Sequence, residues 1–521
     1  MRLSQLISAL PHGAFPPGED PEITGVTQDS RRVKPGMLFV ACTGGTADGH
    51  LFIPRAVEAG AAAVVGERGQ GAEGVPYIRV ADSRRALGLL SAAWFSFPSR
   101  SLVLIGVTGT DGKTTTVSLI FSILRKAGFR AGMIGTVGAV IGGQELDTGF
   151  HVTTPDSPAL QEYLARMVAA GLTHCVMEVT SHGLAQQRVA GCDFDFAAVT
   201  NITHEHLDYH GTFETYRAVK AGLFSELGTA PLKASVKTRV AALNADDPSF
   251  DFLRRQTAVR VITYGRRGKA DLSARDVRLS ADGLRMTIQL PELELPLKSN
   301  LRGEYNADNI LAALAICILG MGIDPQTAVN GVAEMPGVPG RWEPIDLGQD
   351  FQAIVDFAHT PNSLRHVLED AHAMTAEGGR VIAVFGAAGL RDREKRRLMA
   401  ATGVALADLT VLTAEDPRTE KLEDILEEMA AGARSRGGVE GKNFVRIPDR
   451  GEALRFAVRS ARKGDVVLAC GKGHEQSMCF GEVEYPWDDR QAMRAVLAER
   501  LSVAGPELPP LPTSLSTKEE S

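Results

Sequence analysis

The feature that most constrains this chain is a glycine-rich turn between an apolar run and a predicted helix. The run Leu102–Val107 is typical of a strand, and the segment Val117–Lys126 predicts a helix. A turn of this kind, ending in Lys-Thr at a helix N-terminus, holds phosphate oxygens on backbone N–H groups and the lysine, and Mg²⁺ on the hydroxyl. The sequence therefore predicts ATP binding by Gly109, Thr110, Asp111, Gly112, Lys113, Thr114 and Thr115.

The loop departs from the common Walker A pattern at its first position. Val107 stands where that pattern has a glycine, five residues before Gly112, and a glycine lies at position 109 instead. The alternative is an ordinary turn from a strand into a helix, which the complete Gly-Lys-Thr ending disfavours. We expect a less common variety of phosphate loop.

Length and composition exclude several classes of protein. A chain of 521 residues is too long for one hydrophobic core, so we expect roughly two to four domains. The formal net charge of −7 argues against nucleic acid or a membrane surface as the main partner. No apolar run approaches the ~18 residues of a membrane span. Six cysteines without a CxxC pair favour buried thiols. These features indicate a soluble, cytoplasmic protein.

Alternating strands and helices divide the chain into three α/β blocks and a tail. The first block ends in a linker at Trp94–Ser99. The second begins with the phosphate loop and suggests a mostly parallel sheet, followed by a β-rich stretch and the helix Ala307–Leu319. In the third, strands run into polar or glycine-containing loops, as in an open sheet whose strand ends carry ligand contacts. The tail, rich in Pro, Ser and charge, predicts disorder.

Polar side chains follow strands of the second block. Glu178 ends the strand His174–Val179, where an acid near a triphosphate serves as a Mg²⁺ ligand, although a surface acid is an equal alternative. Lys220, in the helix Phe213–Leu227, has the character of a solvated surface residue. A polar cluster follows the run Phe194–Thr200 and matches no zinc motif, so a Mg²⁺ site with one imidazole and one carboxylate suits it better. This cluster consists of His204, Glu205, His206, Asp208 and His210.

Strand ends of the third block carry further candidates. Asp356 and His359 follow one predicted strand, and the segment 471–475 follows another; both suit adenine, ribose or phosphate contacts, with plain loop chemistry as the alternative. Arg391 begins a basic run that predicts a solvated helix face. The segment 415–418 is equally consistent with a turn, although the fork of Arg418 fits a carboxylate.

In their order along the chain, these motifs resemble the Mur ligase family over nearly all of residues 1 to about 500. The shortened loop 109–115 is similar to that family's phosphate loop. The resemblance implies an α/β protein of three-domain Mur ligase architecture, with a central P-loop ATPase-like domain and a C-terminal Rossmann-like domain. It assigns residues 1–98 to UDP-sugar binding, 99–336 to ATP, 337–503 to the amino acid and 504–521 to a disordered tail.

The resemblance also implies a reaction. Members most similar to this chain are ATP-dependent ligases of peptidoglycan precursor synthesis that join a diamino acid to the D-glutamate γ-carboxylate of UDP-MurNAc-L-Ala-D-Glu, through an acyl phosphate. The expected partners are that nucleotide sugar, ATP with Mg²⁺, and a diamino acid, in a monomer. Meso-diaminopimelate is slightly favoured over L-lysine or L-ornithine: Arg418 suits its distal carboxylate, whereas Asp416, where the family typically has Asn, could prefer a bare ammonium.

Site roles follow from the resemblance by position. The expected catalytic residues are Lys113, Glu178, His206 and Lys220; Thr114, Glu178, His206 and a carbamylated Lys220 would serve the metals. Besides the loop 109–115, ATP is expected at Asn306, Asn309, Arg341, Asp356 and His359. The UDP-sugar dipeptide is expected at Gln28, Ser30, Gly45, Thr46, Ala47, Thr153, Thr154, Thr180, Gln186 and Arg188. The amino acid is expected at Arg391, Glu415, Asp416, Pro417, Arg418, Gly471 and Glu475.

Two alternatives share part of this pattern. A folylpolyglutamate synthase would have the same loop and a lysine like Lys220, but it would lack the first block with its Asp29-Ser30-Arg31 segment. A non-catalytic nucleotide-binding homologue would have no need of a second metal site, which the retained His206 and Lys220 suggest.

Overall fold

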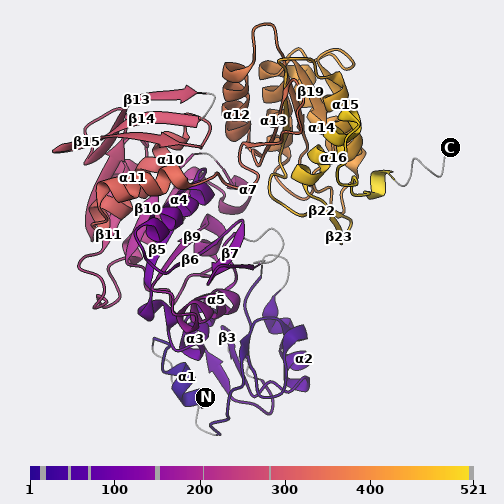
Figure 1. Cartoon of the computed structure of the whole chain (residues 1–521). Helices are drawn as coiled ribbons and strands as arrows, with labels where there is room; N and C mark the ends of the chain where they lie inside the picture. Colours follow the sequence, from indigo (N-terminus) through magenta and orange to yellow (C-terminus); the bar gives the residue numbers. More distant parts are fainter. Residues whose placement is uncertain are drawn as a thin grey trace.

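The computed structural model describes residues 1–11, 19–44, 48–68, 72–146, 153–203, 205–280 and 283–514. Their strands form sheets of four, eleven, six and two strands. In Figure 1 the three larger sheets follow the chain from bottom to top right, and each has helices packed beside it. The mixed α/β class predicted from the sequence is confirmed.

The first sheet is small and entirely parallel, in the order β1-β2-β3-β4. Its strands are buried between short helices, which explains their continuous apolar runs. The elements are α1 (Leu3–Ile7), β1 (Val26–Thr27), η1 (Ser30–Arg32), β2 (Leu38–Val40), η2 (Gly49–Phe52), α2 (Ile53–Glu58), β3 (Ala63–Gly66), β4 (Tyr77–Arg79), α3 (Ser83–Trp94) and η3 (Pro98–Ser101).

The middle sheet has eleven strands in the order β15-β14-β13-β12-β11-β10-β5-β9-β6-β7-β8. Its centre is parallel, and antiparallel strands extend both sides. The strands are β5 (Val103–Thr108), β6 (Ala131–Gly135), β7 (Gly138–Ile141), β8 (Gln144–Leu146), β9 (His174–Glu178), β10 (Phe196–Val199), β11 (Val240–Asn244), β12 (Arg260–Gly265), β13 (Leu272–Ser280), β14 (Gly283–Leu290) and β15 (Leu293–Ser299). The helices are α4 (Lys113–Lys126), α5 (Ser157–Ala169), α6 (Ser181–Ala185), α7 (Leu207–His210), α8 (Phe213–Glu226), α9 (Phe250–Gln256), α10 (Asn306–Leu314), the π-helical η4 (Ala315–Gly320) and α11 (Pro325–Glu334).

Strand β5 shows why this sheet needs helices on both faces. Val103, Ile105 and Val107 face the core formed with α4, α10 and α11, whereas Leu102 and Leu104 face the opposite core. Because successive side chains of a strand point to opposite faces, an unbroken apolar run is buried on both sides. The predicted strand was therefore correct, and α4 begins earlier than expected, at Lys113 itself.

The third sheet has the order β16-β17-β21-β18-β19-β20 and is parallel except for β16. The strands are β16 (Glu343–Pro344), β17 (Gln352–Asp356), β18 (Val381–Phe385), β19 (Leu409–Leu412), β20 (Phe444–Arg446) and β21 (Val466–Cys470), with a hairpin of β22 (Ser477–Phe480) and β23 (Val483–Pro486). The helices are α12 (Pro361–Met374), α13 (Arg393–Leu406), α14 (Leu422–Ser435), α15 (Arg450–Ser460) and α16 (Asp489–Leu501). The open sheet expected here is confirmed.

The hydrophobic cores refine the expected block limits. Val338 still packs in the middle core, and the third core begins at Trp342. The third core also includes Leu511, which is 1% exposed, within the tail for which the sequence predicts disorder. Leu508 also packs against this core, so the expected disorder is wrong for this short segment, because the two leucines supply apolar area that composition alone concealed. Residues 515–521 of the expected tail lie outside the described part. No helix within the described residues is long and apolar enough to cross a membrane.

A buried ion pair holds the end of the third sheet together. Arg450 and Asp489 are both fully buried, and the guanidinium donates to both carboxylate oxygens at 2.7 and 2.6 Å. The same guanidinium donates to the carbonyl of Ala414, shortly after β19, and to that of Cys470, which ends β21. Arg450 therefore ties together the two loops that begin at Glu415 and Gly471.

We predict that Arg450→Met lowers the free energy of unfolding of the third domain by about 3–5 kcal/mol, because the substitution leaves the Asp489 carboxylate buried without its partner. Urea unfolding followed by tryptophan fluorescence measures this, since Trp487 donates to Asp489. The double variant Arg450→Met/Asp489→Leu should recover part of the loss. A single variant within about 1 kcal/mol of the parent would contradict this reading of the pair.

Candidate active site

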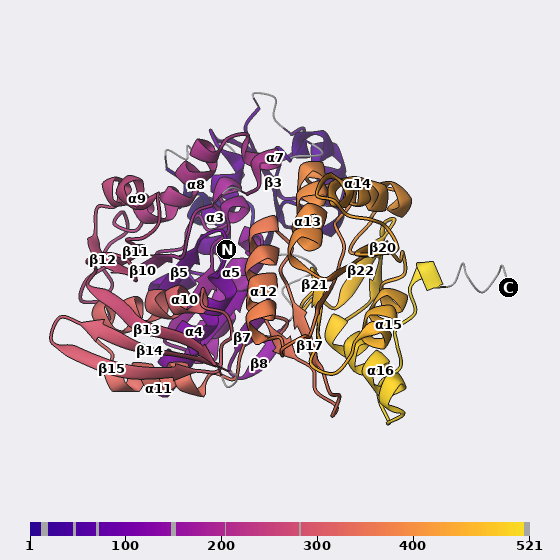
Figure 2. The same cartoon turned by 90° about the horizontal axis from the view of Figure 1, so that it is seen from above.

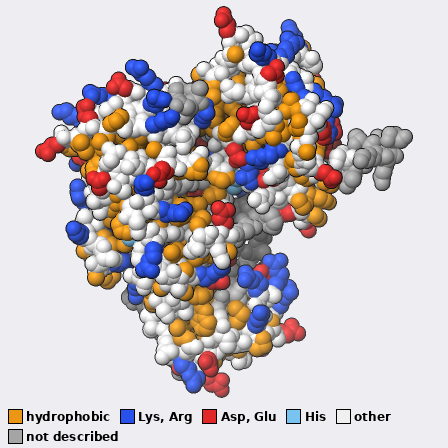
Figure 3. All heavy atoms as spheres, in the orientation of Figure 1, with side chains coloured by type: hydrophobic (Ala, Val, Ile, Leu, Met, Phe, Trp, Pro, Cys, Tyr) orange, Lys and Arg blue, Asp and Glu red, His pale blue; other side chains and the backbone are white. Residues whose placement is uncertain are grey.

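The carboxyl ends of strands from the middle and third sheets line one cleft of about 2290 Å³. The middle sheet contributes residues that follow or end β5, β6, β9 and β10, and the third contributes residues after β17, β18, β19 and β21. Figure 2 shows the two halves side by side, and the space-filling view of Figure 3 shows a hollow between them. Ligand sites in open α/β sheets lie at this edge.

Two glycines give the phosphate loop its shape. Gly109 has φ +148°, and a Cβ there would lie 1.9 Å from the Thr200 hydroxyl. Gly112 has φ +82°, and a Cβ there would lie 2.1 Å from Asn309 Oδ1. The loop is thus pressed against β10 on one side and α10 on the other, which requires glycine at both positions.

The carbonyl of Gly109 accepts hydrogen bonds from two lysines. Lys113 Nζ lies 3.1 Å from this oxygen and 2.7 Å from the Thr110 carbonyl. Lys220 Nζ lies 2.7 Å from the same Gly109 oxygen. Lys220 was expected on the surface from its helix context alone, but it is 1% exposed. Burial, and then the nearby charge of Lys113, lower the pKa of Lys220 well below its usual value, which favours a neutral amine.

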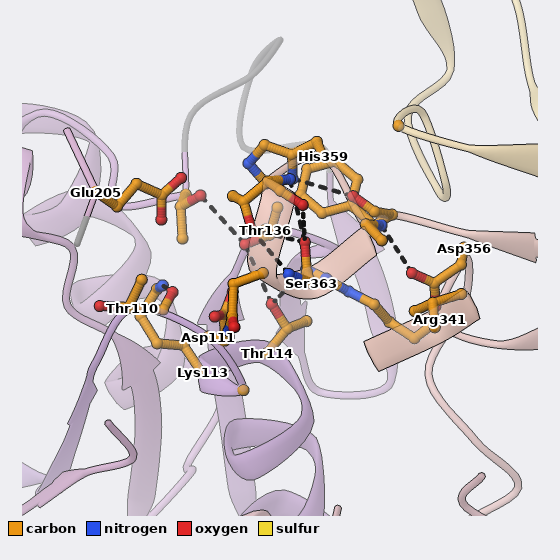
Figure 4. Close-up of a pocket in the computed structure, with 18 of the residues that line it drawn as sticks. Thr110, Asp111, Lys113, Thr114, Thr136, Glu205, Arg341, Asp356, His359 and Ser363 are labelled. Atoms are coloured by element: carbon orange, nitrogen blue, oxygen red, sulfur yellow. Dashed lines mark hydrogen bonds between the residues drawn. The ribbon is translucent and has the colours of Figure 1, made fainter. Parts of the chain in front are cut away.

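Glu178 lies beside Thr114 at the end of the parallel strands. Its carboxylate accepts from the backbone N–H of Thr136 at 2.8 Å and from the Thr136 hydroxyl at 3.0 Å. The Thr114 hydroxyl lies 3.4 Å from that same hydroxyl. Figure 4 shows Thr136 and Thr114 next to each other, with Arg341 extending toward them from the third sheet. The expected carboxylate and hydroxyl ligands therefore lie together.

His206 and Glu205 lie at the start of α7. The His206 ring is 4.7 Å from that of His182, and burial, with His182 and nearby lysines, lowers the pKa of His206 to about 2. A neutral imidazole is able to bind a cation. Glu205 Oε1 is buried without a hydrogen-bond partner and lies 3.8 Å from Lys395 Nζ of α13. His204, expected in the same cluster, lies outside the described residues.

These residues fit a Mg²⁺ ion that arrives bound to a nucleotide better than a metal ion held by protein ligands alone. Among the described residues no three His, Cys, Asp or Glu side chains converge on one ion. Mg²⁺ keeps several waters and binds through one or two protein oxygens together with phosphates. Thr114 with Glu178 provides such a pair, and the carboxylate oxygen of Glu205 without a hydrogen bond lies in the same cleft.

The residues expected at ATP outside the phosphate loop meet across the cleft. Asn309 donates to Asn306 Oδ1 at 2.8 Å at the start of α10. Asp356 accepts from the N–H groups of Trp342 and Ala358 at 2.6 and 2.7 Å. Arg341 stacks on the Phe357 ring at 4.4 Å, and burial, with Lys395, lowers the pKa of His359 to about 3. All five expected residues line the cleft: Asn306, Asn309, Arg341, Asp356 and His359.

The residues expected for the nucleotide sugar fall into two groups. Thr153, Thr154, Thr180, Gln186 and Arg188 line the cleft, and Arg188 donates to the Thr154 carbonyl and to Gln186. Gln28 and Ser30 do not line it; Gln28 instead bonds Asp156 of the middle part at 3.3 Å. Gly45, Thr46 and Ala47 lie outside the described residues.

The residues expected for the amino acid surround the far end of the cleft, where Arg391, Glu415, Asp416, Arg418, Gly471 and Glu475 line it and Pro417 does not. Arg418 has φ +55°, and its Nε is buried without a hydrogen-bond partner. A buried guanidinium N–H left unpaired is a preformed place for an anion. In the basic run that begins at Arg391, Arg396 is buried and paired with Glu420 and Glu428.

Lys472 places a buried positive charge between two carboxylates at this end of the cleft. It is fully buried, and its Nζ lies 3.0 Å from Asp416 Oδ1 and 2.5 Å from Glu475 Oε2. Burial alone would lower the pKa of Lys472, but Glu475 and Asp416 raise it above its usual value. Burial, and then Asp416, raise the pKa of Glu415 to about 7. Asp416 therefore shares one internal cation, Lys472, with Glu475.

No role was predicted for Thr136, and Lys472 and His474 were expected only as members of the segment 471–475, without a role of their own. Thr136 follows an apolar strand beside the phosphate loop, and this position was its only signal. Lys472 and His474 lie in a glycine-flanked loop after a buried strand, where a lysine usually belongs to the surface. Their partners are 56 and 338 residues away along the chain, so no local pattern could show them.

Comparison with known proteins gives one consistent result. Three family models match: "Mur ligase family, catalytic domain" over residues 22–95, "Mur ligase middle domain" over 107–317 and "Mur ligase, glutamate ligase domain" over 340–473. The UDP-N-acetylmuramoyl-L-alanyl-D-glutamate–2,6-diaminopimelate ligase of Geobacillus thermodenitrificans is 42% identical, over 96% of this chain and 100% of that protein.

Two further proteins agree. The UDP-N-acetylmuramyl-tripeptide synthetase of Roseiflexus sp. is 42% identical over 96% of this chain and 99% of that protein. A solved structure of a UDP-N-acetylmuramoyl-L-alanyl-D-glutamate–2,6-diaminopimelate ligase has a TM-score of 0.66 and 30% identity, over 96% of this chain and all of that one. The family expected from the motifs is confirmed: the chain belongs to the Mur ligases, ATP-dependent enzymes that form amide bonds.

Proposed function

We propose that this enzyme joins meso-diaminopimelate to the D-glutamate γ-carboxylate of UDP-MurNAc-L-Ala-D-Glu in peptidoglycan precursor synthesis. The observation that carries the proposal is one cleft lined by a phosphate loop, by Thr154 and Arg188, and by Arg418, whose buried Nε has no hydrogen-bond partner among the described residues. The names of the relatives in Geobacillus and of the solved structure support the same substrates. We further propose that the protein is a cytoplasmic monomer.

The proposed chemistry needs positive charge more than proton transfer. A carboxylate attacks the γ-phosphate of ATP without a general base, giving an acyl phosphate and ADP, and the amine then displaces phosphate. Lys113 would turn from its carbonyl partners to the phosphates, and Arg341 would approach them from the third domain. Mg²⁺, held by Thr114 and Glu178, would neutralise developing charge. Closure of the third domain would exclude water from the acyl phosphate.

Lys220 is proposed to act as a carbamate. Carbamylation by CO₂ requires a neutral amine, and the lowered pKa of Lys220 supplies one at neutral pH. The resulting anion would replace a buried cation beside Lys113 and would offer two oxygens toward a second Mg²⁺, with His206 as a further ligand. This role accounts for the burial of a lysine that, within the described part of the chain, donates its hydrogen bond to the Gly109 carbonyl.

The charge balance at the acceptor end supports meso-diaminopimelate over lysine or ornithine. The family usually has Asn where this chain has Asp416. The Asp416 carboxylate would favour the side-chain ammonium of lysine or ornithine only if it faced the bound amino acid. Instead Lys472 and the N–H of Cys479 both donate to Asp416 Oδ1. Arg418, with its Nε unpaired, then remains the group suited to a distal carboxylate, which lysine and ornithine lack.

We predict that phosphate release from ATP requires both UDP-MurNAc-L-Ala-D-Glu and a diamino acid. The value of kcat/KM for meso-diaminopimelate should be at least about 100-fold above that for L-lysine or L-ornithine, because losing a charged pair costs about 1.5–3 kcal/mol per hydrogen bond. A coupled phosphate assay with the three amino acids measures this. Equal or higher efficiency with L-lysine would contradict the proposed acceptor, and release that needs no nucleotide sugar would contradict the proposed donor.

We predict that Arg418→Ala raises KM for meso-diaminopimelate about 10- to 100-fold and leaves KM for ATP within about twofold, because only the acceptor loses a charge-assisted bond. Arg434→Ala is the matched control, since Arg434 is an exposed α14 residue paired with Glu427 outside the cleft. An unchanged KM for the amino acid in Arg418→Ala would remove Arg418 from the acceptor site.

We predict that Lys220→Ala loses at least about 1000-fold in kcat while the protein stays folded, because it removes charge stabilisation at the transition state. The carbamate itself is tested by ¹³C NMR of enzyme equilibrated with ¹³CO₂, where wild type should show a carbamate carbon that Lys220→Ala lacks. Lys220→Arg, which keeps a cation, should be equally inactive. Substantial activity in either variant, or identical spectra, would rule the carbamate out.

A further inference from the structure

Thr136 holds the Glu178 carboxylate from two sides. The Thr136 backbone N–H donates to Glu178 Oε1 at 2.8 Å, and its hydroxyl lies 3.0 and 3.1 Å from the two carboxylate oxygens. Gly135 allows this approach, because a Cβ there would lie 2.4 Å from Glu178 Oε1. Bonds from a neutral donor to a carboxylate are charge-assisted and therefore strong. The orientation of Glu178 consequently depends on Thr136.

The same threonine also lies beside the other proposed metal ligand. The Thr114 hydroxyl is 3.4 Å from the Thr136 hydroxyl, and Thr153 is 3.1 Å from it on the muramoyl side. A hydroxyl has one proton and two lone pairs, so it is able to donate to the carboxylate while accepting from a neighbouring hydroxyl. Thr136 thus sets the spacing between the Thr114 hydroxyl and the Glu178 carboxylate.

His474 reaches this arrangement from the third domain. Its Nε2 lies 3.2 Å from the Thr136 carbonyl oxygen, and because a carbonyl only accepts, Nε2 carries the proton. The His474 ring packs on Phe357 at 5.0 Å, and a Cβ at Gly340 would lie 2.1 Å from the His474 backbone nitrogen. The ring is therefore held by its own domain and contacts the middle domain through Thr136.

We propose that Thr136 is a positioning residue that orients the Glu178 carboxylate toward the metal. His474 makes this orientation depend on domain closure, because its hydrogen bond to Thr136 forms only when the third domain lies closed against the middle one. The inference rests on the proposed ATP site. A metal at Glu178 and domain closure then favour each other, because coupling between two binding equilibria is reciprocal. The metal site would be complete only when the third domain has closed, and that closure also brings the acceptor end of the cleft into place.

Calorimetric measurement of ADP binding, with and without Mg²⁺, tests whether Thr136 orients Glu178 for the metal. Partners that orient a metal ligand are typically worth 10- to 100-fold in metal affinity. In Thr136→Val, which keeps the shape but removes the hydroxyl, the gain in ADP affinity due to Mg²⁺ should fall by about tenfold or more. ADP binding without Mg²⁺ should not change, and Thr136→Ser should behave like wild type.

The matched control is Thr173→Val. Thr173 bonds the Arg130 carbonyl at the opposite end of β9 and does not line the cleft, so this variant should keep the full Mg²⁺ effect. An equal Mg²⁺ effect in Thr136→Val and wild type would overturn the positioning role, while the proposed function would stand. Failure of wild type to bind ADP at all would instead overturn the proposed function.

Amide hydrogen exchange tests whether His474 links domain closure to the metal site, and it does not rely on activity. In wild type, Mg²⁺ added to the ADP complex should slow exchange in a peptide covering residues 471–476. In His474→Phe, which keeps the ring against Phe357 but loses the donor, Mg²⁺ should bring no such slowing, although Mg²⁺-ADP still binds. Equal slowing in the variant and in wild type would show that His474 does not couple closure to the metal. Thermal unfolding midpoints within a few degrees of wild type establish that the variants are folded.

Discussion

The active site exists because the carboxyl ends of two parallel sheets face each other across one cleft. In each sheet, parallel strands bring loops from distant parts of the chain to the same edge. Polar contacts between the two edges include Arg341 with Thr114, Lys395 with Glu205, and His474 with Thr136. Thr114, Glu178 and Arg418 all line the cleft between these edges, so the relative placement of the two domains decides whether the site is complete.

Buried charge is arranged differently in the two halves. In the middle domain two lysines share the Gly109 carbonyl, and burial lowers the pKa of Lys220. In the third domain a buried lysine is surrounded by carboxylates, which raise the pKa of Lys472. The first arrangement favours an amine open to modification, and the second fixes a permanent cation. The same residue type thus has two roles, which its partners determine.

Much of the fold followed from local pattern. The strands β5 and β9 were expected almost to the residue, because runs buried on both faces are continuously apolar. The phosphate loop was recognisable because glycine spacing and Lys-Thr are required in sequence. Failures came where burial was decided at long range: Lys220 and Arg396 are buried rather than solvated, and Leu511 belongs to the third core rather than to a disordered tail.

The sequence by itself determined the class of fold, the nucleotide loop and the family, since each depends on residues adjacent in the chain or on motifs in a fixed order. Only the tertiary structure decided how Asp416 is used, because Lys472 pairs with it from another loop. The tertiary structure also revealed Thr136, whose partners Glu178 and His474 lie 42 and 338 residues away. A hydrogen bond acts over about 3 Å of space regardless of sequence distance, so no local pattern records it.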